Sequence, residues 1–243
     1  MNSSQEANMS SLDPTDNQSL VLLNWNADGL KARQPLLKEF LSRHDVDIAC
    51  ITESHFKSSD KFRISGYSVF RYDQPTRSGG VVILVKKQIK HSDILLPALQ
   101  RLQAVGVKLA LNNSQTLRVF AAYHRPGQNL VRSDLESIFD GTPTILLGDL
   151  NSKNLIWGCR KQNSNGVRLY NYSGDLGLHV SAPDEPTHYP YQDTYEPDIL
   201  DISLLHNVSF PFFQTVLTDL DSDHLPVLCT ANSPPQCIPA LPK

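Results

Sequence analysis

The sequence has no uninterrupted apolar run that approaches the length of a membrane-spanning helix. Its first residues, rich in Ser, Asn, Gln and Asp, also lack the apolar centre of a secretory signal peptide. These two absences argue against a membrane partner and against secretion. We therefore expect an intracellular protein, in which Asn-x-Ser sequons such as Asn207-Val208-Ser209 are chance matches.

Cysteine is scarce and an excess of positive charge is missing. The four cysteines, Cys50, Cys159, Cys229 and Cys237, form no Cys-x-x-Cys pair, so the sequence predicts reduced thiols and no zinc site. The formal net charge is -3. A nucleic-acid partner would therefore have to be bound through local basic patches or through metal ions.

What is present is enough apolar sequence for one sizeable core. The chain has 243 residues, of which 40% are hydrophobic and 19% are charged, an ordinary composition for a globular domain. Residues 1–19 have few apolar side chains and are predicted to be a flexible leader. The domain is predicted over residues 20–232, and residues 233–243 are expected to form a Pro-rich tail or linker.

Short apolar segments alternate with turn signals along the domain. Strands are predicted at 20–23, 47–52, 67–72, 81–85, 102–111, 117–123 and 145–147. Helices are predicted between Gly29 and His44, from a capping box at Ser133-Asp-Leu-Glu136, and over 167–176 with a stop at Gly177. Strands outnumber helices and are joined mostly by short hairpins. This pattern favours a layered α/β or α+β sandwich over a doubly wound parallel sheet.

Polar side chains follow the predicted strands at the points where the apolar runs end. The clearest case is Thr144-Ile-Leu-Leu-Gly-Asp-Leu-Asn151. If that strand continues, the side chains of Asp149 and Asn151 share a face and point together into a cleft. Further strand ends carry Asn26 with Asp28, Glu53, Tyr123, Asp201, and Asp223 with His224. Each of these alone is an ordinary turn, cap or packing residue, so the signal lies in their combination.

Taken in order, these motifs resemble those of the endonuclease/exonuclease/phosphatase superfamily, the DNase I-like proteins. The matching segments are Trp25-Asn-Ala-Asp-Gly29, Thr52-Glu-Ser54, Gly148-Asp-Leu-Asn151, Leu200-Asp201 and Ser222-Asp-His224. The resemblance covers about residues 20 to 230. It implies a four-layer α/β sandwich, in which two packed mixed β-sheets are flanked by helices. It also implies metal-dependent hydrolysis of a phosphodiester.

The resemblance implies a Mg²⁺ site, for which Mn²⁺ is a substitute. Glu53 resembles the principal ligand, because a hard carboxylate oxygen suits a hard cation. Asp28 and Asn26 would complete or support this site, and Asp223 resembles a further metal or water contact. The remaining histidines, His44, His55, His91, His179, His188 and His206, are expected to be surface or core residues.

The resemblance also assigns the acid–base and phosphate-binding groups. Asp149 resembles the group that orients or deprotonates the attacking water, and Asn151 resembles its partner in holding the phosphate. His224 resembles the residue that faces the scissile phosphate, with Asp201 accepting from its other ring nitrogen. Tyr123 would hydrogen-bond or help to stabilise the phosphate.

The segments around Asp149 indicate one branch of the superfamily. Asp149-Leu-Asn-Ser-Lys-Asn154, Trp157-Gly-Cys-Arg160, Asn165-Gly166 and Pro186-Thr-His-Tyr189 resemble the apurinic-endonuclease-like endonuclease domains of jockey-type non-LTR retrotransposons. Such domains nick double-stranded chromosomal DNA in the nucleus. The exposed 3′ hydroxyl then primes reverse transcription by a reverse transcriptase domain on the same polypeptide. Abasic-site specificity is not expected, since no tryptophan lies near Asp201.

Cations flank the residues of the expected site. Arg125, Lys153 and Arg160 are candidates for contacts with DNA phosphates, which supply the sequence-independent part of affinity. Ordinary surface charge is the competing interpretation for each of them. Groove contacts are expected from the loop between Thr187 and Pro197, which is rich in Tyr and Pro.

Two other functions are compatible with the same residues. A phosphatase or phosphodiesterase of the same fold would act on a small phosphoester and leave plasmid DNA intact. A catalytically silent, retrotransposon-derived remnant would bind nucleic acid or a partner without cleavage. Retention of every expected site residue argues against the remnant, although instability alone can abolish activity.

Overall fold

Two six-stranded sheets form the centre of the structure, a computed structural model that describes residues 19–192 and 196–238. The first sheet has the order β11 (Phe212–Val216), β12 (Val227–Ala231), β1 (Leu20–Asn26), β2 (Ile48–Thr52), β4 (Val81–Lys86) and β3 (Tyr67–Tyr72). The second has the order β5 (His91–Ile94), β6 (Leu102–Ala110), β7 (Thr116–His124), β8 (Thr144–Asp149), β10 (Asp201–His206) and β9 (His179–Ser181). The helices are α1 (Leu30–Arg43), α2 (Arg132–Ile138), α3 (Ser164–Leu176) and the short 3₁₀ turn η1 (Leu155–Trp157).

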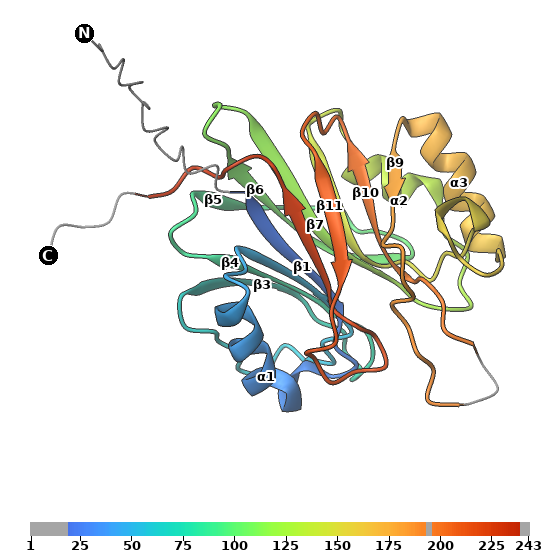
Figure 1. Ribbon diagram of the computed structural model, residues 1–243, viewed down its shortest axis with the longest axis horizontal. Helices are drawn as coiled ribbons and strands as arrows, with labels where there is room; N and C mark the ends of the chain where they lie inside the picture. Colours follow the sequence, from blue (N-terminus) through green and yellow to red (C-terminus); the bar gives the residue numbers. More distant parts are fainter. Residues whose placement is uncertain (1–18, 193–195, 239–243) are drawn as a thin grey trace, which may run out of the picture.

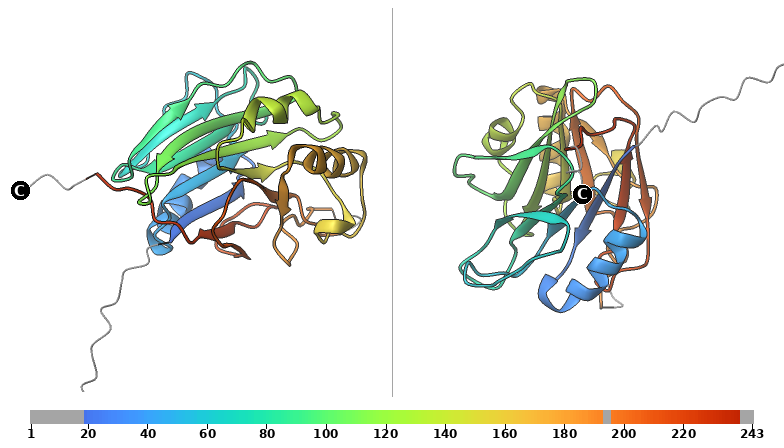
Figure 2. Two further views of the ribbon diagram at one scale, coloured as in Figure 1. Left: turned by 90° about the horizontal axis from the view of Figure 1, so that it is seen from above. Right: turned by 90° about the vertical axis from the view of Figure 1, so that its left-hand side faces the viewer.

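Both sheets are mixed, and they pack face to face with helices outside (Figure 1). The pair β1 and β2 is parallel in one sheet, as is the pair β7 and β8 in the other, while the remaining pairs are antiparallel. Figure 2 shows α1 on one outer side of the sandwich, with α2 and α3 on the other. The predicted four-layer α/β sandwich is confirmed.

Three apolar clusters hold these layers together. The cluster between the sheets contains residues such as Leu22, Ile83 and Leu147, all fully buried. Leu37 on α1 packs against the outer face of the first sheet, and Leu169 on α3 packs against the second. Burial of each such side chain contributes roughly 1.5–3 kcal/mol. None of the helices in the described ranges is long and apolar enough to cross a membrane.

The two parallel pairs explain why the polar strand ends meet. Because β1 and β2 are parallel, with Asn26 opposite Thr52, they end at the same edge of the first sheet. In the second sheet, β7 and β8 run parallel and β10 begins with Asp201 opposite Asp149. The strand ends of both sheets therefore reach one edge of the sandwich, where β1 also contacts β8.

The C-terminal boundary differs from the expected one. Residues 233–238, assigned by sequence to a Pro-rich tail or linker, continue the domain in the structure. The amide of Gln236 donates to the carbonyl of Ala110 at 2.7 Å, and Lys90 donates to Gln236 at 2.8 Å. Isolated bridges also join Leu111 to Pro235 and Ile89 to Cys237. Proline lacks an amide donor, but the residues beside it still pair with the sheet edge. Residues 1–18 and 239–243 lie outside the described residues.

The predicted capping box on the helix after β7 is wrong. Helix α2 begins at Arg132 after Val131, and no side chain caps it. Instead, the buried carboxylate of Asp134 accepts hydrogen bonds from the backbone amides of Gln100 (2.8 Å), Arg101 (2.7 Å) and Leu102 (2.8 Å). The acid thus ties the helix to the start of β6.

This arrangement predicts a large effect of Asp134→Asn on stability. The amide keeps one acceptor oxygen and places NH₂ hydrogens against backbone donors. We expect the free energy of unfolding to fall by about 1.5–3 kcal/mol, the range for hydrogen bonds to a charged group. Urea denaturation followed by circular dichroism measures it. Glu136→Gln on the same helix, at a half-exposed carboxylate, is the control and should leave the midpoint unchanged.

Candidate active site

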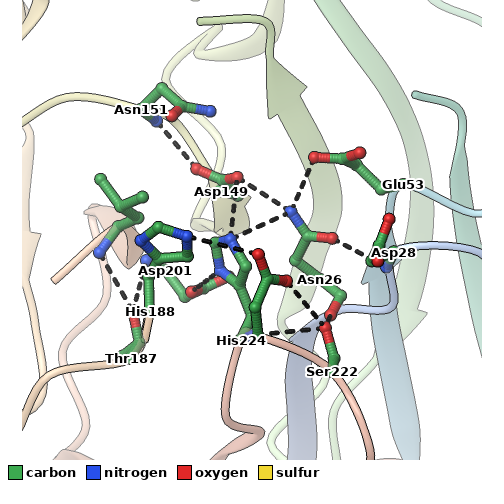
Figure 3. A network of polar contacts seen from close by, with 12 residues as sticks. Asn26, Asp28, Glu53, Asp149, Asn151, Thr187, His188, Asp201, Ser222 and His224 are labelled. Carbon is green, nitrogen blue, oxygen red and sulfur yellow. Dashed lines mark hydrogen bonds and ion pairs between the residues drawn. The ribbon is translucent and has the colours of Figure 1, made fainter. Parts of the chain in front are cut away.

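The side chain of Asn26 lies at the centre of the polar cluster (Figure 3). Its Nδ2 donates to Glu53 Oε1 and to Asp149 Oδ2, both at 3.0 Å. Its Oδ1 accepts from the backbone amide of Asp28 at 3.1 Å. Asn26 is 1% exposed, and its bond to Asp149 is buried, while its bonds to Glu53 and to the Asp28 amide are part-buried. One amide therefore joins the carboxylate carried by the first sheet to the carboxylate carried by the second.

His224 and Asp201 form a buried pair beside this amide. His224 Nδ1 lies 2.7 Å from Asp201 Oδ2, and His224 Nε2 lies 3.9 Å from Asp149 Oδ2. The backbone of His224 is fixed by the Trp25 indole, which donates to its carbonyl at 3.2 Å, and by Ser222, whose Oγ accepts from its amide. The ring is therefore held with one nitrogen on Asp201 and the other toward Asp149.

The surroundings shift the acidities of these groups. Burial alone would lower the pKa of His224, but the adjacent carboxylate of Asp201 raises it above its usual value. Burial raises the pKa of Asp149, an effect that His224 opposes and Asp201 reinforces. A carboxylate with a raised pKa is a better proton acceptor than an exposed one. Asp149 can thus act as a base, and protonated His224 can donate to an anionic oxygen.

Glu53, Asp28 and His55 form a second cluster, in which ligand-type atoms lie within 4.8 Å of one another. Glu53 Oε2 lies 3.1 Å from His55 Nε2. All three residues have positive φ values, 40° for Asp28, 49° for Glu53 and 57° for His55. The two loops that carry them are joined by the Gly29 amide, which donates to the Glu53 carbonyl at 2.8 Å. The sequence therefore folds into two linked turns that present these side chains together.

This donor set fits a hard divalent cation. Two carboxylates offer the oxygen ligands that Mg²⁺ and Mn²⁺ prefer, and Mn²⁺ also tolerates the imidazole of His55. Asn26 Oδ1 accepts a hydrogen bond from the amide of Asp28, which holds the Asn26 side chain beside the proposed cation site. Asp28 and Glu53 are the predicted ligands that the structure brings together.

Asp223, the third predicted ligand, belongs to a different cluster. Its carboxylate lies 3.5 Å from His188 Nε2, and ligand-type atoms of Asp223, His188 and His224 lie within 4.8 Å of one another. Burial alone would raise the pKa of Asp223, but His188 and His224 lower it. The rings of His188 and His224 are tilted, with centroids 4.5 Å apart.

The sequence predicts surface or core positions for His55 and His188, but the structure places each of them in one of these two clusters. His55 could have been identified from its place two residues after Glu53, on the same loop. His188 could not, because an isolated bridge between distant segments places it beside His224.

The predicted geometry of Asp149 and Asn151 is also wrong. Strand β8 ends at Asp149, and Asn151 has a φ of 46°, so the two side chains do not share a strand face. Asp149 Oδ1 accepts from the Asn151 amide at 3.0 Å, and Asn151 Nδ2 donates to the carbonyl of His124 at 2.9 Å. Asn26 and Asp28 repeat this turn. In both, the side chain two residues earlier fixes a left-handed residue.

Tyr123 ends up beside the carboxylates, on the buried side of the site. It is 4% exposed. Burial raises the pKa of Tyr123, and the neighbouring Glu53 raises it further. Its hydroxyl therefore stays protonated and is a hydrogen-bond donor.

The three cations differ in their pairing. Lys153 Nζ lies 3.0 Å from the buried Asp198, and Arg160 lies 2.8 Å from Glu196. Arg125 donates to the hydroxyl of Ser78 at 2.7 Å and, within ranges 19–192 and 196–238, makes no ion pair. Arg125 thus keeps the most available charge of the three. Residues 193–195 of the loop expected to make groove contacts lie outside the described residues.

Sequence comparisons find similar proteins among those of mobile elements. A family model described as endonuclease-reverse transcriptase matches residues 117–228. The RNA-directed DNA polymerase from mobile element jockey of Drosophila melanogaster is 30% identical over 217 residues, 87% of this chain and 24% of that protein. The probable RNA-directed DNA polymerase from transposon X-element of the same species is 27% identical and aligns with 88% of this chain. The chain spans about a quarter (24%) of these relatives' length.

Solved structures share the fold. The endonuclease domain of TRAS1, a telomere-specific non-LTR retrotransposon, superposes with a TM-score of 0.70 at 20% identity, covering 87% of this chain and 97% of that one. The Xenopus laevis APE2 catalytic domain superposes with a TM-score of 0.69 at 17% identity, covering 88% and 92%. The chain thus has the DNase I-like fold of these endonuclease domains, and its sequence is similar to RNA-directed DNA polymerases of mobile elements such as jockey.

Proposed function

We propose that this domain is a Mg²⁺-dependent endonuclease, with Mn²⁺ as a substitute, that hydrolyses one phosphodiester of duplex DNA. The observation that carries the proposal is the amide of Asn26, which bonds Glu53 on one side and Asp149 on the other at 3.0 Å each. This contact supports the proposal because the cluster of Asp28, Glu53 and His55 then lies beside Asp149, which in turn lies beside the His224–Asp201 pair. Hydrolysis of a phosphodiester needs these groups around one phosphate.

Glu53, Asp28 and His55 would hold the cation. When bound, a divalent cation there neutralises charge on the phosphate oxygens and polarises phosphorus. Asp149 accepts a proton from the attacking water, whose oxygen forms the new bond to phosphorus. The bond from phosphorus to O3′ breaks, and O3′ takes up a proton. The products are a 3′ hydroxyl and a 5′ phosphate.

Charge on the reacting phosphate is stabilised by donors that the fold already holds in place. Protonated His224 donates from Nε2, while Asp201 keeps its Nδ1 side fixed at 2.7 Å. The hydroxyl of Tyr123 is a second donor. Preorganised donors of this kind need no reorientation as charge develops. DNA phosphates would be contacted by Arg125, and also by Lys153 and Arg160 once these are released from their acidic partners. Because the net charge of the chain is -3, it needs such local cations to bind DNA.

Nicking of supercoiled plasmid with Mg²⁺ or EDTA tests the proposal. We expect open-circle product with Mg²⁺ and none with EDTA. Glu53→Gln should raise the Mg²⁺ concentration for half-maximal nicking by at least about tenfold, because one charged oxygen ligand is lost. Glu39→Gln, at an exposed carboxylate on α1, is the matched control. Nicking that resists EDTA, or an unchanged Mg²⁺ requirement in Glu53→Gln, would contradict the proposal.

The nicked product then tests the proposed role in a mobile element. A 3′ hydroxyl at the nick can be extended by a DNA polymerase without prior phosphatase treatment. In the parent element we propose that this end primes a reverse transcriptase domain on the same polypeptide, in the nucleus. Support comes from the relatives, which are named RNA-directed DNA polymerases. If plasmid stays intact while small phosphoesters are hydrolysed, the domain is a phosphatase of the same fold.

A further inference from the structure

We propose that Asn163, the residue before helix α3, is a positioning residue that holds the catalytic segment Asn151–Lys153 in its reactive conformation. The proposal rests on the proposed nuclease function. Asn163 lies outside the candidate site, and its side chain reaches the segment from the start of α3. It acts through Asn151 on the carboxylate of Asp149.

Asn163 binds both ends of the short segment. Its Nδ2 donates to the carbonyl of Asn151 at 2.9 Å, and its Oδ1 accepts from the amide of Lys153 at 3.1 Å. The backbone amide of Asn163 donates to the carbonyl of Lys153 at 3.0 Å. The same Oδ1 caps the helix by accepting from Gly166 at 2.7 Å. One residue therefore connects the helix start to three backbone groups of the segment.

The segment needs such support because Asn151 is in a disfavoured conformation. A residue other than glycine at a φ of 46° costs on the order of 1–3 kcal/mol and persists only where its surroundings fix it. The Asn151 amide is fixed by Asp149 and its side chain by His124. Its carbonyl is fixed by Asn163. Without the bond from Asn163, the peptide between Asn151 and Ser152 can rotate. In a fraction of the molecules the Asn151 amide then no longer donates to Asp149, and the Asp149 carboxylate loses its orientation.

The start of helix α3 packs closely against the segment Asn151–Lys153. A Cβ atom added to Gly166 would lie 1.7 Å from the carbonyl oxygen of Lys153, so only glycine fits there. Asn154 Nδ2 also donates to the carbonyl of Gly166 at 3.2 Å. The start of the helix and the catalytic segment thus form one rigid unit. The Asn165-Gly166 motif of the sequence gains a physical reason from this contact.

Asn163→Asp isolates the proposed contact. Aspartate keeps the acceptor oxygen for the amides of Gly166 and Lys153 and is as good a helix cap as asparagine. It replaces the donor that faces the Asn151 carbonyl with a second oxygen. Asn165→Asp is a matched control on the same helix. Asn165 accepts from the Leu130 amide at 2.9 Å and donates to the Gln128 carbonyl at 2.7 Å, so the same exchange disturbs a different loop.

We expect Asn163→Asp to lower the single-turnover nicking rate at saturating Mg²⁺ and DNA by about 10–100-fold, since small misplacement of a catalytic group has effects of this size. KM for the plasmid should stay within about threefold, because ground-state binding is kept. Asn165→Asp should retain the wild-type rate. Asn163→Ser, which caps the helix but is too short to reach Asn151, should share the defect. Melting temperatures establish that the variants are folded at the assay temperature.

A double-mutant cycle with Asn151→Ala tests whether the effect passes through Asn151. We expect the double variant to nick no more slowly than the slower single variant, because both substitutions disrupt the same chain of contacts from Asn163 through Asn151 to Asp149. A wild-type rate in Asn163→Asp, an equal loss in Asn165→Asp, or losses that multiply in the double variant would overturn the inference. These outcomes require a wild-type domain that nicks plasmid. Absence of nicking by the wild type is instead the failure of the proposed function.

Discussion

Replacement of His224 by alanine is expected to lower the rate of DNA nicking by about 10²–10⁴-fold, the range for loss of a proton-transfer or charge-stabilising group. His224 is 5% exposed, and its ring connects Asp201, at 2.7 Å, with Asp149, at 3.9 Å. Without it the phosphate loses a cationic donor. Asp149 also loses the neighbour that opposes the upward shift of its pKa, so more of it is protonated and inactive as a base.

Single-turnover nicking at saturating Mg²⁺ measures this loss. His206→Ala is the control, since His206 ends β10, the strand that begins with Asp201 in the site, and it should nick at the wild-type rate. Asp201→Asn, which keeps the ring but removes its charged partner, should fall between the wild type and His224→Ala. A change of under about threefold in His224→Ala would remove the residue from the mechanism.

The architecture could be predicted because apolar segments mark its strands. Residues 81–85 of β4 and the whole of Thr144–Asp149 are buried, and a strand buried on both faces shows this in its sequence. Their ends are visible because polar residues such as Asn26 and Asp149 interrupt the run. The combination of polar groups at several strand ends was thus the signal for a site. The parallel pairs in both sheets then place those ends together.

The backbone at the strand ends could not be predicted by the same argument. The two-residue period of a strand applies only while the strand continues. At Asp28 and Asn151 the chain turns into the left-handed region, with φ values of 40° and 46°. Asn and Asp accept that region more readily than most residues, and a side chain two positions earlier can fix it. The residue types at these positions therefore indicated the site correctly, but the extended backbone inferred for Asp149 to Asn151 was wrong.

Partners that come from distant loops were also beyond sequence reasoning. His188 reaches His224 through an isolated bridge, and Lys153 meets the buried Asp198 at 3.0 Å. Neither pair has a spacing that a helix or strand period would reveal. The same holds for Asp223, which lies with His188 and not with Glu53. The loop conformations, and not the strand ends, decide that Asp28 and Glu53 lie in one cluster and Asp223 in another.

Replacement of Asn26 by aspartate is expected to lower nicking by about 10²–10³-fold, the size measured for loss of one preorganised donor in an active site. The amide supplies two hydrogens, one to Glu53 and one to Asp149, at 3.0 Å each. A carboxyl group in its place has at most one hydrogen and, when ionised, none. The carboxylate introduced at position 26 would lie beside those of Glu53 and Asp149, and three carboxylates this close cannot all stay ionised. At least one of the two acids therefore loses its partner, while the bond to the Asp28 amide is retained.

The dependence on Mg²⁺ separates the two halves of the site in this variant. If Asn26 serves only the cation cluster of Asp28, Glu53 and His55, excess Mg²⁺ restores the rate of Asn26→Asp. If it also orients Asp149, the rate stays low at saturating Mg²⁺, because the base remains misplaced when the cation is bound. We expect the second result. Unchanged circular dichroism and unchanged duplex binding in EDTA would show that the variant loses rate in the chemical step and not through folding or DNA binding. The Asn26 amide would then be the group that joins the two clusters into a single site, through one hydrogen bond to Glu53 and one to Asp149.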